Sequence, residues 1–116
     1  MVKFTRSKSM KNLKFRRNLV PLVLSGQKTS TWRLFDDKNL SVGDAVELKV
    51  FVTLEMFGKA VITDVITKPF KDLSVADKTG HEEFKDDDEM YATYSKYYSC
   101  TVDWNTELKI ISFKLV

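Results

Sequence analysis

Eight consecutive residues, Gly26 to Arg33, combine side chains that a small reaction centre needs. The segment Gly-Gln-Lys-Thr-Ser-Thr-Trp-Arg carries an amine, three hydroxyls, an aromatic ring and a guanidinium. Because successive side chains of a strand point to opposite faces, Thr31 and Arg33 share one face and Trp32 takes the other. We therefore expect Lys28, Thr31 and Arg33 to converge at one helix-to-strand corner, with Trp32 in the core.

These side chains suit the hydrolysis of an amide. Such a reaction needs a nucleophile, a base that takes its proton and an acid that protonates the departing amine. Thr31 supplies the nucleophile, and Lys28 supplies the base if burial lowers its pKa. Each residue also has an ordinary explanation: a helix dipole favours Lys28 after a helix end, Thr31 is a good strand former, and Arg33 can pair with Asp36 or Asp37.

The elements that position this corner follow from the pattern on either side of it. Residues 18–25 predict a short helix that Asn18 caps and Gly26 stops. Further strands are expected at 11–15, 31–35, 45–54, 59–67 and 106–116, with 45–54 and 59–67 forming an antiparallel hairpin. Ser74 begins a short helix that Gly80 breaks, and residues 86–98 predict a longer helix with acids at its N-terminus.

Several short strands favour a sheet that closes on itself, since closure removes exposed edges. We predict an α+β fold, a small and mostly antiparallel β-barrel with two or three peripheral helices. An open α+β sandwich is the alternative. The 116 residues suit one domain, which we place at residues 11–116 after a basic N-terminal arm at residues 1–10.

The net charge of +3 is unevenly distributed. Residues 1–18 contain seven lysines and arginines and no acid, so the rest of the chain carries −4. A basic segment of this kind suits a polyanion such as RNA, with an affinity that falls as salt rises, and it equally suits a tail that improves solubility. Arg16 and Arg17 adjoin the predicted first helix, so they are the better candidates for phosphate contacts.

The composition argues against several classes of protein. A single cysteine, Cys100, and a single histidine, His81, leave too few ligands for a structural zinc site, so we predict no metal and no cofactor. Cys100 is interpreted as a small buried side chain. No apolar run approaches the roughly 20 residues of a membrane span, and no secretory signal is present. We therefore expect a cytoplasmic monomer with no membrane partner and no evident protein partner.

Four motifs together resemble the ASCH domain. They are G-x-K-x-x-T-x-R after a short apolar helix, the turn Ser-Val-Gly-Asp at 41–44, Leu-Ser at 73–74 with a helix beyond it, and Ile-Ile-Ser-Phe at 110–113. The resemblance spans about residues 13 to 113. It implies the barrel shared by pseudouridine synthases and archaeosine transglycosylases, called PUA-like, and a nucleoside or single-stranded RNA as partner.

The resemblance also implies candidate site residues. Some small bacterial ASCH proteins are amidohydrolases of N(4)-acetylcytidine, and their pattern pairs a lysine and a threonine three apart with a later glutamate. Lys28 and Thr31 match directly, and Glu82 matches the acid. Glu83 stands where relatives often have glycine, which leaves it as the alternative acid.

We therefore predict an amidohydrolase that converts N(4)-acetylcytidine to cytidine with Lys28, Thr31 and Glu82. Phosphate and ribose contacts are assigned to Arg33, Arg16 and Arg17, and stacking on the base to Tyr98, with Tyr97 and Trp32 as alternatives. Because ASCH proteins also include ribonucleases and binding modules, a non-catalytic RNA-binding module or a ribonuclease is the alternative.

Overall fold

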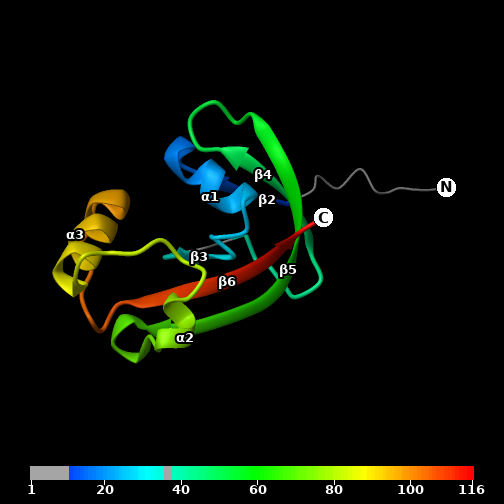
Figure 1. The fold of residues 1–116 in the computed structure, drawn as a ribbon. Coiled ribbons are helices and arrows are strands. Elements are labelled where there is room, and N and C mark those ends of the chain that lie inside the picture. Colours follow the sequence, from blue (N-terminus) through cyan, green and yellow to red (C-terminus); the bar gives the residue numbers. More distant parts are fainter. Residues whose placement is uncertain (1–10, 36–37) are drawn as a thin grey trace.

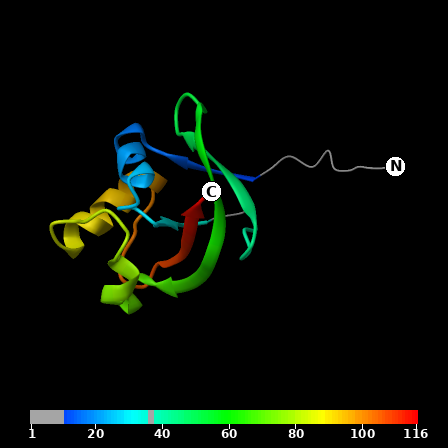
Figure 2. The same cartoon turned by 45° about the vertical axis from the view of Figure 1, so that its right-hand side comes forward.

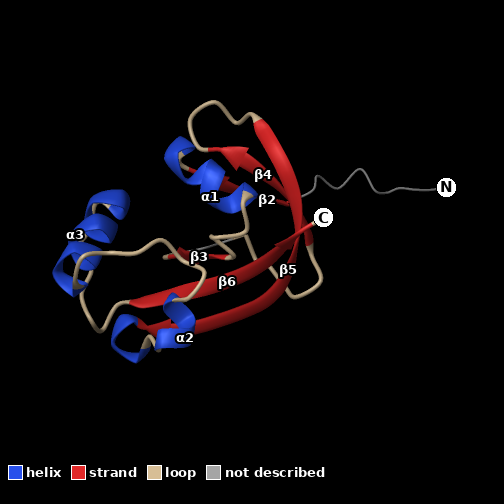
Figure 3. Ribbon diagram, viewed as in Figure 1, coloured by secondary structure: helices blue, strands red, loops and turns tan. Residues whose placement is uncertain are grey.

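The computed structural model describes residues 11–35 and 38–116, and a single curved sheet organises them (Figures 1 and 3). Its strands are β2 (Lys11–Phe15), β3 (Ser30–Arg33), β4 (Ala45–Val50), β5 (Met56–Pro69) and β6 (Glu107–Leu115), hydrogen-bonded in the order β2-β4-β5-β6-β3. β2 runs parallel to β4, and the other pairs are antiparallel. The register shifts between Ile62 and Asp64, and such bulges bend a strand. Figure 2 shows β5 arcing around the outside, with the helices on its concave side.

The predicted α+β class is correct, but the closed, mostly antiparallel barrel is wrong. The sheet is mixed and forms a half-barrel, because its end strands β2 and β3 form no hydrogen-bonded pair with each other. β3 has only four residues and pairs with β6 alone among the described strands. A side chain crosses the gap instead, since Arg33 Nη2 donates to the Lys14 carbonyl oxygen at 2.7 Å.

The helices agree closely with expectation except at the first one. The 3₁₀ turn η1 (Arg17–Leu19) leads into α1 (Val20–Leu24), whose N-cap is Leu19 without a side-chain hydrogen bond, so the predicted cap at Asn18 is wrong. Gly26 has the expected left-handed conformation, with φ of 84°. The remaining helical elements are η2 (Phe70–Asp72), α2 (Val75–Lys78) and α3 (Asp87–Tyr98), and side chains of Ser74 and Asp86 cap the last two as expected.

Two apolar clusters hold these elements together. One fills the curl of the sheet around Leu13, Leu48 and Ile111, and the other packs α3 against β3 and β6 through Trp32 and Tyr94. Trp32 is thus in the core, as predicted. The expected strand 45–54 ends at Val50, and Val52 beyond its end is exposed.

Two further observations bear on the function classes. Cys100 is exposed, so its interpretation as a buried side chain is wrong. Within residues 11–35 and 38–116, no group of three metal-ligating side chains lies together, and no helix is long and apolar enough to cross a membrane. The predicted arm at 1–10 and the possible partners Asp36 and Asp37 lie outside the described residues.

Candidate functional site

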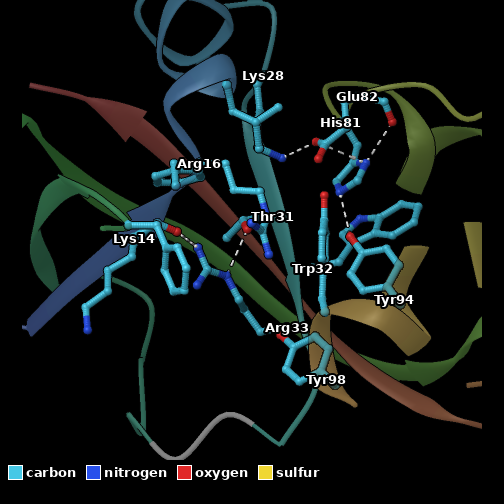
Figure 4. A pocket seen from close by; sticks show the side chains of 14 residues that line it. Lys14, Arg16, Lys28, Thr31, Trp32, Arg33, His81, Glu82, Tyr94 and Tyr98 are labelled. Carbon is cyan, nitrogen blue, oxygen red and sulfur yellow. Dashed lines mark hydrogen bonds and ion pairs between the residues drawn. The ribbon is translucent and has the colours of Figure 1, made fainter. Parts of the chain in front are cut away.

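The predicted corner lies in a cavity of about 200 Å³ between the open ends of the half-barrel and α3 (Figure 4). Lys28 comes from the loop after α1, Thr31 and Arg33 come from β3, and Glu82 comes from the loop between α2 and α3. Arg16 and Tyr98 also line the cavity. The structure therefore brings together six of the seven residues predicted for the site.

Lys28 and Glu82 form an ion pair inside this cavity. Lys28 Nζ donates to Glu82 Oε1 at 2.5 Å, and only 2% of the lysine side chain is exposed. Burial lowers the pKa of Lys28 below its usual 10.5, although the Glu82 carboxylate opposes that shift. Burial by itself would raise the pKa of Glu82, but the charge and the hydrogen bond of Lys28 bring it below the usual value. The pair is therefore placed to exchange a proton.

Backbone contacts of Gly80 bring the Glu82 loop to the corner. The Gly80 carbonyl oxygen accepts the N–H groups of Thr29 at 2.7 Å and Ser30 at 3.1 Å, immediately before and at the start of β3. Gly80 has φ of 82°, and a Cβ there would overlap the Thr29 hydroxyl oxygen. Only glycine meets both conditions without strain. The predicted helix break at Gly80 is therefore also the point where two distant segments join.

Arg33 holds the hydroxyl of Thr31. Its Nε donates to Thr31 Oγ1 at 2.9 Å, which confirms that the two side chains share a face, while its Nη2 reaches the Lys14 carbonyl. Thr31 is 5% exposed. A guanidinium donor beside the hydroxyl oxygen stabilises the negative charge that develops when the hydroxyl loses its proton. Figure 4 shows this chain of contacts from Lys14 through Arg33 to Thr31.

His81 is a site residue that the sequence reasoning considered only as a metal ligand. It is buried and stacks on Trp32, with ring centres 3.8 Å apart. Its Nδ1 lies 2.9 Å from the Glu82 carbonyl oxygen, and its Nε2 lies 3.2 Å from the Tyr94 hydroxyl. A carbonyl only accepts, so Nδ1 carries the proton and Nε2 accepts from Tyr94.

Burial, followed by the charge of Lys28, lowers the pKa of His81 to about 4. The imidazole is therefore neutral near pH 7 and fixes the backbone at Glu82. The available sequence signal was that the chain's only histidine stands directly before the candidate acid.

The other predicted residues divide between the edge of the cavity and its surroundings. Arg16 is exposed and lies over the Tyr97 ring, 4.0 Å from its centre. Tyr98 is half-buried, and its hydroxyl accepts the N–H of Leu34 at 3.1 Å. Arg17 lies outside this cavity, and its Nη2 is 3.9 Å from Glu55 Oε1. Glu83 is exposed and lines neighbouring cavities, so Glu82 is the carboxylate that meets Lys28.

No family model and no curated protein matches the sequence. Solved structures do match. Protein EF3133 from Enterococcus faecalis V583, of the family DUF984, gives a TM-score of 0.75 at 19% identity, over 95% of this chain and 82% of that chain. The ASCH domain from Lactobacillus crispatus JV V101 gives 0.63 at 14% identity, over 84% of this chain and 70% of that chain. The ASCH protein from Zymomonas mobilis gives a TM-score of 0.64 at 11% identity, over 88% of this chain and 64% of that chain.

The chain has an ASCH-like fold. The resemblance stated from the sequence motifs is therefore confirmed at the level of the fold. At identities below 20%, these neighbours establish the arrangement of the elements, so the chemistry of this ASCH-like domain must be argued from its own cavity.

Proposed function

We propose that this ASCH-like domain hydrolyses the amide of N(4)-acetylcytidine and releases cytidine and acetate. The observation that carries the proposal is the buried Lys28, bonded to Glu82 in the same cavity as the Thr31 hydroxyl. A buried lysine with a lowered pKa, paired with an acid in a cavity that also holds a hydroxyl, combines the groups that amide hydrolysis requires.

The first half of the reaction forms an ester on Thr31. Burial favours loss of the Lys28 proton to solvent, and the neutral amine that results takes the Thr31 hydroxyl proton while the oxygen attacks the carbonyl carbon of the acetyl group. Lys28 passes the proton to Glu82 along their hydrogen bond, and Glu82 delivers it to the cytosine N4 as the carbon–nitrogen bond breaks. Cytidine leaves with its amine restored, and the acetyl group remains on Thr31.

The second half returns the enzyme to its starting state. Lys28 takes a proton from a water molecule whose oxygen attacks the ester carbon, and it returns that proton to the Thr31 oxygen as the ester bond breaks. The acetic acid that forms leaves as acetate and a proton. Lys28, His81 and Glu82 also line an adjoining cavity of about 580 Å³, which offers water a second approach to the pair.

The proposal is tested by following the conversion of N(4)-acetylcytidine to cytidine by chromatography. We expect turnover by the wild type, and a loss of at least about a hundredfold in kcat in Thr31→Ala and in Lys28→Met, since each removes a group that acts in the bond-breaking step. Thr31→Ser keeps the hydroxyl, so it should retain part of the activity.

Folding controls make either result informative. Circular dichroism and thermal unfolding should show that each variant is folded, and Lys28→Met is suitable because it removes the buried charge while keeping an unbranched side chain of similar length. A folded wild type with no turnover, or a Thr31→Ala variant as active as Thr31→Ser, would contradict the proposal.

A non-catalytic RNA-binding module is the second candidate, and the exposed guanidinium of Arg16 on Tyr97 favours it. This function predicts an affinity for single-stranded RNA that falls steeply with salt and is insensitive to Thr31→Ala. Hydrolysis of the neutral nucleoside should instead tolerate salt. Cleavage of the RNA during the same binding experiment would identify a ribonuclease.

A further inference from the structure

Arg16 lies at the edge of the cavity in a prearranged position. Its guanidinium carbon is 4.0 Å from the centre of the Tyr97 ring and 5.2 Å from the centre of the Phe51 ring, so side chains from α3 and from the loop after β4 hold it. No carboxylate pairs with it within the part of the chain that the structure describes. Stacking occupies the face of a guanidinium and leaves its N–H edge available for a planar anion.

The size of the cavity restricts what it encloses. About 200 Å³ is less than the roughly 300 Å³ at which ordinary small-molecule pockets begin, and the larger adjoining cavity is lined by neither Thr31 nor Arg16. The cavity that holds Thr31 therefore suits an acylated base better than a whole nucleotide. The sugar and anything attached to it then remain at the opening, where exposed side chains lie. Arg16 is exposed, whereas Thr31 is 5% exposed.

The chemistry of cytosine sets the direction of the sugar. The acylated amine on C4 and the glycosidic nitrogen N1 lie on opposite edges of the ring. When the acyl group is held between Thr31 and Glu82, the ribose must therefore point away from these buried groups. In the view of Figure 4, Arg16 lies across Thr31 from the Glu82 loop. The Lys14 side chain points away from Thr31 in the same view.

The charges around the cavity favour an anionic group on the substrate. Lys28 and Glu82 offset one another, so Arg16 adds a positive charge that a neutral nucleoside leaves without a partner. On the basis of the function proposed above, we propose that the substrate is a nucleotide, an acylated cytidine whose ribose carries a phosphate that Arg16 binds at the cavity opening. Arg16 is then a specificity-determining residue, and Thr31, Lys28 and Glu82 perform the reaction.

The experiment compares kcat/KM for N(4)-acetylcytidine with kcat/KM for its 5′-monophosphate. We expect the wild type to favour the monophosphate by roughly tenfold or more, since a charge-assisted guanidinium–phosphate contact has that magnitude. Arg16→Gln should bring the ratio close to one, and Arg16→Lys should leave an intermediate ratio because lysine keeps the charge but not the planar fork. Lys96→Gln, which removes a charge from α3 beside Tyr97, is the matched control and should keep the wild-type ratio.

Binding of the products separates this inference from the proposed function. In calorimetry, the wild type should bind cytidine 5′-monophosphate roughly tenfold more tightly than cytidine. The Arg16→Gln variant should bind the two products with equal affinity. That binding result without any hydrolysis would support the phosphate site and overturn the proposed reaction. Hydrolysis with no preference for the monophosphate, or a preference that survives Arg16→Gln, would overturn the phosphate site and leave the reaction standing.

A third substrate identifies the source of the phosphate. A trinucleotide with N(4)-acetylcytidine at its centre presents the same phosphate as part of a strand. A kcat/KM above that of the monophosphate would assign the site to RNA, and a kcat/KM at or below it would assign the site to free nucleotides. If neither the trinucleotide nor the monophosphate has a higher kcat/KM than the nucleoside, the proposal is overturned.

Discussion

At the residue scale, burial gives Lys28 its chemical character. Lysine is almost never fully buried unless it is paired, and Lys28 meets this condition through Glu82. The pair holds two charges away from water, so each side chain depends on the other for its protonation state. His81 and Arg33 act on this pair and on Thr31 by position, since one holds the backbone at Glu82 and the other holds the hydroxyl.

The neutrality of His81 predicts a pH-dependent stability. Its folded pKa of about 4 lies below the unfolded value of 6.5, so the unfolded chain binds more protons between these values. The free energy of unfolding should therefore rise with pH over this window, and this group should account for about 3 kcal/mol lost as the pH falls from 6.5 to 4. Urea unfolding at several pH values measures the effect.

The matched variant for this test is His81→Phe, which keeps an aromatic ring against Trp32 but has no group to titrate. The comparison uses the change in stability with pH, so a constant destabilisation of the variant does not affect it. Carboxylates other than Glu82, which lies beside His81, contribute equally to both proteins. Identical pH dependence in the two proteins would show that His81 is not a buried neutral group.

At the element scale, the site depends on the attachment of one loop to one strand. The loop between α2 and α3 carries His81 and Glu82, and the carbonyl of Gly80 attaches it to the segment that begins β3. Lys28 and Glu82 are 54 positions apart in the chain, yet this attachment brings their side chains into contact. The geometry of the loop therefore decides whether Lys28 and Glu82 meet.

Replacing Gly80 with alanine should damage both stability and activity. The left-handed backbone costs an alanine about 1 kcal/mol, and the overlap with the Thr29 hydroxyl oxygen adds to this cost. Gly43→Ala is the control, because Gly43 has φ of 92° but no atom lies near its added Cβ. Urea unfolding should show Gly80→Ala to be less stable than Gly43→Ala by about 1–3 kcal/mol. Equal losses would mean that the contact with Thr29 is not tight.

At the scale of the whole molecule, the sheet stops short of closure, and the cavity occupies the opening. Arg33 crosses from β3 to the Lys14 carbonyl on β2 while also holding Thr31, so a contact that bridges the half-barrel also orders the site. In the sequence, residues 1–18 are positive and the remainder is negative, so we expect the N-terminal segment either to attract a polyanion or to improve solubility.

Neutralising the charges at the N-terminus should separate RNA affinity from nucleoside hydrolysis. Lys3, Arg6 and Lys8 lie outside the described residues, and we expect their replacement by glutamine to leave hydrolysis of N(4)-acetylcytidine unchanged. The slope of log affinity for single-stranded RNA against log salt should decrease in magnitude by about 2, since three phosphate contacts would be lost. Fluorescence anisotropy at several salt concentrations measures this slope. An unchanged slope would assign the three residues to solubility alone.

The sequence by itself determined the local features of this protein. Strand alternation placed Thr31 and Arg33 on one face, left-handed glycine ended the first helix, and caps at Ser74 and Asp86 began α2 and α3, because each depends on neighbours a few positions away. The motifs also indicated the ASCH-like fold. Only the tertiary structure decided that the sheet stays open, that Arg17 pairs with Glu55 outside the cavity, and that His81 orders the site. These outcomes depend on contacts between distant segments and on burial, which local spacing does not encode.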